Sequence, residues 1–316
     1  MKKTIAVVMD PIESIKISKD TSFALLLEAQ SRGYLIYYVE PGSLNIDGGH
    51  TFAYLSELIV KDDINEYFKK GPSKLTALST ISAILMRKDP PVDDQFIYDT
   101  QILSLAETEG VLVVNSPQGL RDMNEKLTAL LFPQCCPETL VSRNKKDLKA
   151  FIHKHRDTVL KPLDGMGGKS IFRVKDNDSN INVILETLTA NGAMALAQKF
   201  IPEIEQGDKR ILLVDGVPVS YTLARIPQGD EFRGNLAAGG KGEGRPLSER
   251  DRWIANEVGP WLKERGMLLV GLDVIGDYLT EVNVTSPTCV RELDAQFGLN
   301  IAALVFDAVE KRLSVI

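Results

Sequence analysis

Three oxygen-bearing side chains near the end of the chain could bind a metal ion together. Asp273, Glu281 and Asn283 interrupt two runs rich in Val, Leu and Ile, and these runs flank Gly276-Asp277. The pattern is typical of two antiparallel strands joined by a tight turn. Carboxylate and amide oxygens are hard ligands, of the type that Mg²⁺ takes when it also holds nucleotide phosphates. The alternative is an exposed hairpin whose polar side chains only face water.

The register of this hairpin decides whether the three side chains share one face. Glu281 and Asn283 lie two residues apart and therefore project from the same face of a strand. A strict two-residue turn would pair Asp273 with Thr280 and place Asp273 on the opposite face. An odd-numbered loop or a bulge would instead bring all three side chains together. We predict the odd-numbered loop.

A glycine-rich stretch after Lys161 is the second candidate. Residues 158–161 have the pattern of a buried strand, Leu163-Asp-Gly-Met-Gly-Gly-Lys-Ser follows, and a strand pattern resumes at residue 171. Glycines let backbone N–H groups approach a phosphate closely, and lysines supply positive charge. The spacing fits neither a P-loop nor a dinucleotide fingerprint, because required glycines and the following helix are missing. We predict a hairpin that folds over a nucleotide; the alternative is an ordinary flexible hairpin.

Two arginines and a long loop form the third candidate. Arg210 and Arg225 lie on the two arms of a hairpin that turns at Asp215-Gly216. Residues 226–245 follow, rich in glycine and carrying Arg233, with few apolar anchors. A long loop of this kind is often a mobile active-site lid. The alternative is a disordered surface insertion.

The N-terminal part of the chain predicts a sheet that could position these groups. Residues 4–9 form an apolar run, residues 20–30 have helical periodicity and residues 35–39 form a second apolar run. This is one βαβ unit of an open, mostly parallel sheet. Ligands of such sheets gather beyond the carboxyl ends of the strands. Asp10 and Ser22 therefore lie in the predicted crevice, although both residue types are also common in turns and caps.

Further elements complete this sheet. Arg87 follows another strand, in a charged segment that ends in two prolines. Its guanidinium can clamp a carboxylate, and the alternative is a solvated charge run. Residues 93–110 predict a helix and residues 111–114 a strand. Residues 42–80 have mixed polarity, and we place a helix and some strand there.

The rest of the chain alternates strands and helices. Lys126 lies in a helix predicted from Gly119, where a lone lysine is commonly a surface charge. Residues 193–201 predict a strand, residues 247–265 a helix, and a closing helix begins at about Asn300.

Composition excludes several classes of partner. The 316 residues carry a formal net charge of -6, which argues against nucleic acid or an anionic membrane as a partner. No apolar run approaches the roughly twenty residues of a membrane span. The apolar run at the N-terminus is too short for a signal peptide. The three cysteines show no metal-binding spacing, which favours a reducing, cytoplasmic setting.

Taken together, these motifs resemble those of the ATP-grasp ligases and, among them, bacterial glutathione synthetase. The resemblance covers nearly the whole chain and is weakest at residues 42–80. It lies in Val8-Met-Asp-Pro11, Met86-Arg-Lys-Asp-Pro-Pro91, Asn124-Glu-Lys-Leu127, Lys161-Pro-Leu-Asp-Gly-Met-Gly-Gly168, Leu223-Ala-Arg-Ile-Pro-Gln-Gly229, Arg233-Gly-Asn-Leu-Ala-Ala-Gly-Gly240 and Thr280-Glu-Val-Asn-Val-Thr-Ser-Pro-Thr-Cys289.

The resemblance implies an α/β fold that becomes α+β in its C-terminal half. An open parallel sheet at residues 1–122 would be followed by an ATP-grasp fold. The latter would comprise a lid subdomain at 123–200 and a C-terminal subdomain at 201–316, with the metal site and a mobile loop at 226–245. The family joins γ-glutamylcysteine to glycine through an acyl phosphate and converts ATP to ADP and phosphate. Other carboxylate–amine ligases of this fold, and a protein that binds ATP without chemistry, are the alternatives.

The resemblance also implies roles for individual residues. Asp273, Glu281 and Asn283 would hold Mg²⁺ or Mn²⁺, and related bacterial enzymes are homotetramers. Arg210, Arg225 and Arg233 would act in catalysis. The expected ATP-binding residues are Lys126, Lys161, Gly165, Gly167, Gly168, Gln198, Lys199, Phe200, Ile201 and Asp208. The expected residues for the peptide and glycine are Asp10, Ser22, Arg87, Ser286 and Arg291.

Overall fold

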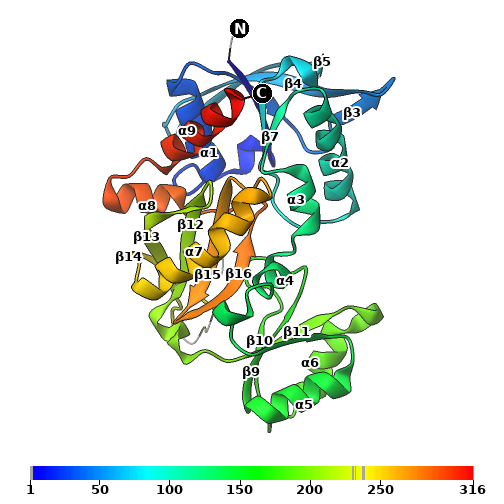
Figure 1. Cartoon of the computed structure of the whole chain (residues 1–316), viewed down its shortest axis with the longest axis vertical. Helices are drawn as coiled ribbons and strands as arrows, with labels where there is room; N and C mark the ends of the chain where they lie inside the picture. The colour runs from blue at the N-terminus through cyan, green and yellow to red at the C-terminus, as the bar shows by residue number, and fades with distance from the viewer. Residues whose placement is uncertain (1–2, 230, 232, 237–238, 316) are drawn as a thin grey trace.

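Three sheets follow one another along the longest axis of the chain (Figure 1). The computed structural model describes residues 3–229, 231, 233–236 and 239–315. The N-terminal sheet lies at one end, a five-stranded sheet in the middle and a four-stranded sheet at the other end. Two hydrophobic clusters each contain side chains of both the N-terminal and the five-stranded sheet, whereas the four-stranded sheet has a core of its own.

Parallel strands form the centre of the N-terminal sheet, as the sequence predicts. Strand β1 pairs in parallel with β2 and β6, and β6 pairs in parallel with β7. Asp20 and Asp93 cap the two helices by accepting hydrogen bonds from the backbone N–H groups of Phe23 and Phe96. The elements are β1 Thr4–Val8, α1 Thr21–Ser31, β2 Leu35–Val39, β6 Ala83–Met86, α2 Asp94–Thr108 and β7 Leu112–Val114.

The helix predicted within residues 42–80 is wrong, because this segment extends the sheet with antiparallel strands. Strands β3 Leu44–Asp47 and β5 Phe68–Ala77 both pair with β4 His50–Val60, which in turn pairs with β2. Strand β5 lies at the edge, and most of its side chains are exposed or half-buried. Such a strand needs no apolar run, so hydrophobic periodicity gives little sign of it.

The helix predicted from Gly119 is in fact two helices, α3 Pro117–Asp122 and α4 Glu125–Ala129. The side chain of Asn124 accepts hydrogen bonds from the backbone N–H groups of Lys126 (3.0 Å) and Leu127 (3.1 Å). An Asn that caps in this way begins a new helix, so the chain breaks there. The cap places Lys126 in the first turn of α4.

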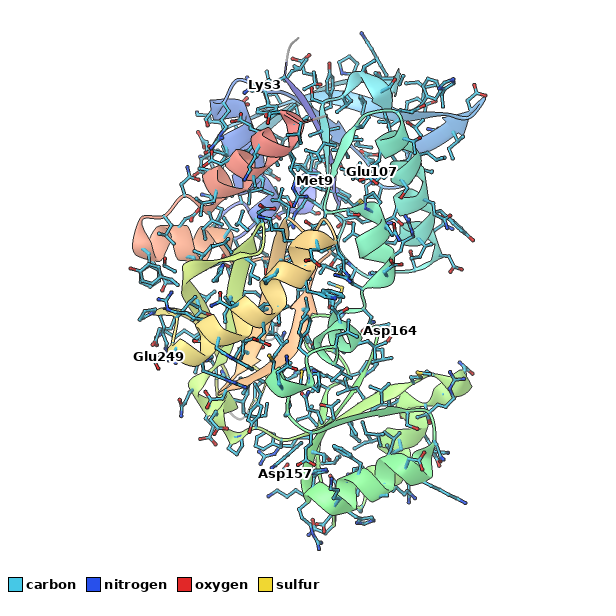
Figure 2. The ribbon with its side chains drawn as sticks, in the orientation of Figure 1. Lys3, Met9, Glu107, Asp157, Asp164 and Glu249 are labelled. Carbon is cyan, nitrogen blue, oxygen red and sulfur yellow. The ribbon has the colours of Figure 1, made fainter. Side chains whose placement is uncertain are left out.

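The four-stranded sheet contains the predicted glycine-rich hairpin. Strands β9 and β10 are antiparallel neighbours, and the loop 163–171 joins them. Asp157, where β9 begins, lies near the far end of the molecule, whereas Asp164 of the loop lies close to the middle sheet (Figure 2). The strand order is β10-β9-β11-β8. The elements are β8 Thr139–Ser142, α5 Lys145–His155, β9 Asp157–Pro162, β10 Phe172–Lys175, α6 Ile181–Leu188 and β11 Ala195–Lys199.

The five-stranded sheet has the order β14-β13-β12-β15-β16, and all its neighbours are antiparallel. The hairpin of β12 and β13 turns at Asp215-Gly216, as predicted. Helix α8 was not predicted. The elements are β12 Asp208–Val214, β13 Val217–Ile226, β14 Lys241–Pro246, α7 Glu249–Glu264, β15 Leu269–Ile275, β16 Tyr278–Asn283, α8 Val290–Phe297 and α9 Ile301–Leu313.

The predicted boundaries 226–245 of the long loop are wrong at both ends. Ile226 ends β13, and Lys241 begins β14 directly opposite it. Strand β14 contains two glycines and no apolar residue other than its proline, so its backbone pairing with β13 is invisible to hydrophobic periodicity. The loop therefore spans residues 227–240, of which positions 230, 232, 237 and 238 lie outside the described residues.

Candidate active site

The β15–β16 hairpin brings Asp273, Glu281 and Asn283 to one face, but not through the predicted odd-numbered loop. The turn Gly276-Asp277 has two residues, and a bulge at Thr280 then shifts the register so that Asp273 pairs with Glu281. A bulge adds one residue to one strand and thereby changes which face the following side chains occupy. The loop prediction is wrong, and the bulge achieves the same convergence.

The amide of Asn283 has a fixed orientation. Asn283 lies opposite Gly271, and its Nδ2 donates a hydrogen bond to the carbonyl oxygen of Gly271 (3.3 Å). The amide oxygen is therefore the atom that remains available to a cation.

Two buried arginines hold Asp273 as a carboxylate. Arg210 donates from Nε (2.5 Å) and Nη2 (3.0 Å) to Asp273, and Arg225 Nη2 lies 2.8 Å from its Oδ2. Burial alone would raise the pKa of Asp273, but the two guanidinium charges outweigh it and hold this pKa well below its usual range. The neighbouring strands β12, β13 and β15 supply the three side chains, so the sheet itself fixes this group.

Asp208 shares Arg225 with Asp273 but has a different protonation equilibrium. Its Oδ2 accepts a hydrogen bond from Arg225, whereas its buried Oδ1 has no hydrogen-bond partner among the described residues. Burial raises the pKa of Asp208 to about 7, against the opposing charge of Arg225. An unpaired buried oxygen is costly unless a ligand satisfies it.

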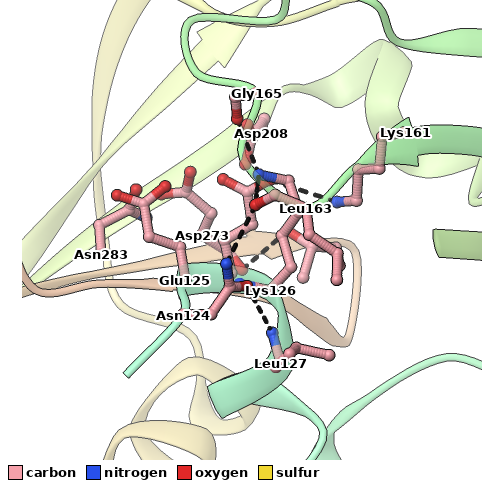
Figure 3. Close-up of polar contacts among 12 residues, drawn as sticks. Asn124, Glu125, Lys126, Leu127, Lys161, Leu163, Gly165, Asp208, Asp273 and Asn283 are labelled. Atoms are coloured by element: carbon pink, nitrogen blue, oxygen red, sulfur yellow. Dashed lines mark hydrogen bonds and ion pairs between the residues drawn. The ribbon is translucent and has the colours of Figure 1, made fainter. Parts of the chain in front are cut away.

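Lys126 of helix α4 and Lys161 of strand β9, both labelled in Figure 3, each form an ion pair with Glu281. Their Nζ atoms lie 3.8 Å and 3.3 Å from Glu281 Oε1, and both lysines are buried. Lys126 also donates to the carbonyl oxygen of Gly165 (2.8 Å), which ties α4 to the glycine-rich loop. Burial raises the pKa of Glu281, but the charges of Lys161 and Lys126 lower it by more. The surface-charge alternative for Lys126 is therefore wrong.

The glycine-rich loop and the loop 227–240 contact each other over the site. Arg233 donates from Nη1 to the carbonyl oxygen of Gly168 (2.7 Å). Gly168 has φ +82°, and a Cβ there would lie 2.8 Å from Asn235 Oδ1, so a side chain would both strain the loop and separate the two loops.

One cavity of about 290 Å³ connects these groups. Its lining combines the lysines, the arginines and the carboxylates with both loops. One wall is formed by the end of strand β11 and the two residues after it, Gln198, Lys199, Phe200 and Ile201. Every residue expected to bind ATP or the metal, and each of the three expected catalytic arginines, lines it. The volume and lining are those of a small-molecule site.

The five residues expected to bind the peptide and glycine have different positions. Ser286 lines the cavity. Asp10 accepts a hydrogen bond from the backbone N–H of Asp89 (2.9 Å), and Asp89 lines the cavity. Arg291 lies outside the cavity lining and pairs with Asp62 (2.7 Å).

Arg87 and Ser22 are bonded to each other. Arg87 donates from Nε to Ser22 Oγ (3.0 Å) and from Nη2 to the carbonyl oxygen of Pro287 (3.0 Å), and all three groups are buried or half-buried. Arg87 thus reaches the cavity through the backbone of Pro287, which lines it. The alternative interpretation, in which Arg87 belongs to a solvated charge run, is therefore wrong.

The sequence reasoning missed Glu125, which lines the same cavity. Glu125 Oε1 accepts a hydrogen bond from Thr285 Oγ1 (3.4 Å). Burial, and then the negative charge of Glu281, raise the pKa of Glu125 to about 7. Its position directly before Lys126 was the only available signal, because its burial arises from the packing of α4 against β16.

The donor set suits a hard divalent cation. Two carboxylates and one amide oxygen face the cavity, and the nearby lysines and arginines balance the carboxylate charge. No group of three or more His, Cys, Asp or Glu side chains that could hold a metal occurs within the described part of the chain. A cation at this face would therefore take its remaining ligands from phosphate oxygens and water, as Mg²⁺ commonly does.

Two family models together match nearly the whole chain. The model described as the prokaryotic glutathione synthetase N-terminal domain matches residues 3–121. The model described as the ATP-grasp domain of prokaryotic glutathione synthetase matches residues 125–298. The chain belongs to the prokaryotic glutathione synthetase family. It is therefore an ATP-dependent ligase, and ATP-grasp ligases use ATP together with a divalent metal ion.

Curated relatives agree over the full length of this family member. The glutathione synthetase of Xanthomonas axonopodis pv. citri (strain 306) is 66% identical over 311 residues, which are 98% of each chain. The glutathione synthetase of Escherichia coli (strain K12) is 56% identical over 310 residues, again 98% of each chain.

Solved structures with much lower sequence identity share the fold. D-cycloserine synthetase DcsG has a TM-score of 0.67 at 16% identity, over 98% of this chain and 99% of that one. The ATP-grasp ligase PsnB, solved with a precursor variant, Mg and ADP, has a TM-score of 0.63 at 15% identity, over 98% and 99% of the two chains. The ATP-grasp fold predicted from the sequence is confirmed. No described helix is both long and apolar enough to cross a membrane.

Proposed function

We propose that this member of the family joins the cysteinyl carboxylate of γ-glutamylcysteine to the amine of glycine, with ATP converted to ADP and phosphate. One observation carries the proposal: Lys126 and Lys161 on one side, and Arg210 and Arg225 on the other, enclose the pair of Asp273 and Glu281 in a single cavity. Positive charge around a hard-oxygen face is what phosphoryl transfer requires.

The first step activates the carboxylate. A carboxylate acylates amines poorly at neutral pH, so its oxygen attacks the γ-phosphorus of ATP, ADP leaves and an acyl phosphate forms. Lys126 and Lys161 bind the phosphates in this proposal, and the backbone N–H groups of Gly165, Gly167 and Gly168 approach them from the loop. Asp273, Glu281 and Asn283 would hold a divalent ion, which would supply further charge neutralisation at the phosphate oxygens.

The second step forms the amide bond. The amine of glycine attacks the acyl carbon, an oxyanion develops, and phosphate leaves as the carbonyl reforms. Arg210 and Arg225 lie buried beside Asp273, where their hydrogen bonds would stabilise this oxyanion, an effect of roughly 3 kcal/mol for one well-placed donor. Arg233 would help the two loops to exclude water, which would otherwise hydrolyse the acyl phosphate.

The substrates would occupy opposite ends of the cavity. The adenine would lie along Gln198, Lys199, Phe200 and Ile201, and Asp208 would accept hydrogen bonds from the ribose hydroxyls through its unpaired Oδ1. The peptide and glycine would bind near Ser286, with Asp10, Ser22, Arg87 and Arg291 contributing to that end.

The proposal also includes the metal ion, the oligomeric state and the cellular location. We expect Mg²⁺ or Mn²⁺ as the divalent ion, a homotetramer and a cytoplasmic location; all three cysteines are free. We further propose an N-terminal domain at 1–122, a lid subdomain at 123–200 and a C-terminal subdomain at 201–316.

Phosphate release tests the proposal. The protein is incubated with ATP and Mg²⁺, with γ-glutamylcysteine and glycine together and with each left out in turn. Release only with both substrates supports the synthetase reaction. Release with other carboxylate and amine pairs alone would reassign the chain to a different ATP-grasp ligase. No acceptor-dependent ADP release from any pair would indicate ATP binding without chemistry.

A further inference from the structure

Asn115 connects the N-terminal sheet to the open end of the β15–β16 hairpin. It follows β7 directly and its side chain is 4% exposed. Its Oδ1 accepts hydrogen bonds from the backbone N–H groups of Leu268 (2.7 Å) and Leu269 (3.0 Å). Its Nδ2 donates to the carbonyl oxygens of Leu269 (2.8 Å) and Val284 (2.7 Å).

These four bonds use the full donor and acceptor capacity of the amide. Nδ2 bonds one carbonyl oxygen on each side of the hairpin. Leu269 is the first residue of β15, and Val284 directly follows β16. Two acceptors cannot bond each other, so a group with two N–H donors must stand between them. The amide of Asn115 lies between the two carbonyl oxygens and comes from outside the sheet. No other side chain of its size offers two N–H donors and an acceptor oxygen at once.

The bond to Val284 fixes the backbone next to the expected cation ligand Asn283. The following residues Thr285, Ser286 and Pro287 line the cavity. Arg87, which follows the neighbouring strand β6, holds the carbonyl oxygen of Pro287 (3.0 Å). The ends of two adjacent parallel strands are thus each followed by a side chain that binds the segment 284–287, of which residues 285–287 line the cavity.

We propose that Asn115 is a positioning residue for cation binding and catalysis: it holds the ends of β15 and β16 together and thereby places Asn283 and the segment 285–287. Asn115 itself is not among the residues that line the cavity. The inference rests on the proposed function in one respect, namely that Asn283 is a cation ligand.

The test compares Asn115→Ser, which keeps one hydroxyl donor, and Asn115→Ala, which keeps none, with the control Val113→Ala. Val113 lies on β7, two residues before Asn115, is 2% exposed and packs in the core, so its truncation weakens the fold but removes no side-chain hydrogen bond to the hairpin. Binding of Mn²⁺ in the presence of a non-hydrolysable ATP analogue is followed by electron paramagnetic resonance, and thermal midpoints are measured in parallel.

We expect Asn115→Ala to weaken Mn²⁺ binding by about 10-fold, the smaller effect typical of a lost outer-shell partner, and Asn115→Ser to weaken it less. Val113→Ala should lower the thermal midpoint and leave Mn²⁺ affinity unchanged. Equal Mn²⁺ affinity in all four proteins would overturn the role of Asn115. If even the unmodified protein failed to bind Mn²⁺ with the analogue, the metal assignment in the proposed function would fail instead.

If the alanine variant does not fold, Asn115→Ser can still be used to test the proposal. Its folded state should show faster hydrogen exchange at residues 268–275 and 283–287 than Val113→Ala does. Exchange equal to that of the control in both segments would refute the positioning role without any metal.

Discussion

Asp273 and Glu281 are cross-strand partners in the β15–β16 ladder, and the bulge at Thr280 alone makes them so. Without the bulge, the two-residue turn would place Asp273 opposite Thr280 and on the other face of the sheet. Each carboxylate has its own positively charged side chains. Arg210 and Arg225 pair with Asp273, and Lys126 and Lys161 pair with Glu281. The pair can therefore remain ionised side by side.

Glu281→Gln should raise the Mg²⁺ requirement and lower turnover, because the amide keeps the shape of the side chain but removes its charge. We expect a decrease in turnover of about 10- to 100-fold. Phosphate release is measured against Mg²⁺ concentration at saturating substrates. Asp277→Asn removes the same charge from the exposed turn of the same hairpin and should change neither quantity. Unchanged Mg²⁺ dependence in Glu281→Gln would refute the metal assignment.

Arg225→Leu should destabilise the fold by about 3–5 kcal/mol, because it removes the guanidinium that Asp208 and Asp273 share in a buried site. Urea denaturation at pH 7 measures the free energy of unfolding. Addition of Asp208→Asn should recover part of the loss, since one buried carboxylate then disappears.

Arg156→Ala is the control, because it removes an arginine from an exposed ion pair instead of a buried one. Arg156 pairs with Asp176, its side chain is 76% exposed, and the expected cost is at most about 1 kcal/mol. A similar small loss for Arg225→Leu would mean that the buried network contributes no more than a surface pair.

Glu125→Gln should become more stable relative to the unmodified protein as pH rises. The folded pKa of Glu125 is about 7, above its ordinary value of 4.5. The unmodified protein therefore loses stability as pH rises between these two values, because the carboxyl ionises in the unfolded chain while the buried one keeps its proton; the glutamine variant does not. The full difference is at most about 3 kcal/mol.

Urea midpoints at pH 5, 6, 7 and 8, without metal or nucleotide, follow this difference. A gap between the two proteins that stays constant over this range would show that Glu125 does not titrate there.

Shortening the loop within residues 227–240, while β13 and β14 are kept, should uncouple ATP hydrolysis from ligation. Arg233 and Gly168 would no longer hold the two loops together, and water would reach the acyl phosphate. ADP and the tripeptide product are measured in the same reaction. A ratio near one in the shortened protein would contradict the role of the loop as a lid.

Local patterns predicted the elements that carry the site. The apolar runs of β1 and β2, the hairpin turn at Asp215-Gly216 and the glycines after Lys161 each determine structure over a few residues. These features needed no information from distant parts of the chain. The resemblance of motifs added the order of the elements and the family.

Features that depend on the exact pairing of strands or on distant partners could not be predicted. The bulge at Thr280 is not distinguished by any residue type in the hairpin, since the same letters fit an odd-numbered loop. Strand β14 exists only through backbone pairing with β13. Glu125 becomes a buried acid only when α4 packs against β16, and Asn115 finds its partners more than 150 residues away in the chain.

Gly271, opposite Asn283 in the hairpin, has a consequence for how the family can vary. A Cβ at this position would lie 2.8 Å from Arg210 Cδ and 3.2 Å from Pro287 Cβ. Even alanine would push Arg210 from Asp273 or displace the segment after β16. A saturation library selected under conditions in which growth depends on the enzyme's activity should therefore return glycine at position 271, although strands normally disfavour it. A constraint on the chemistry of the site then falls on a residue without a side chain.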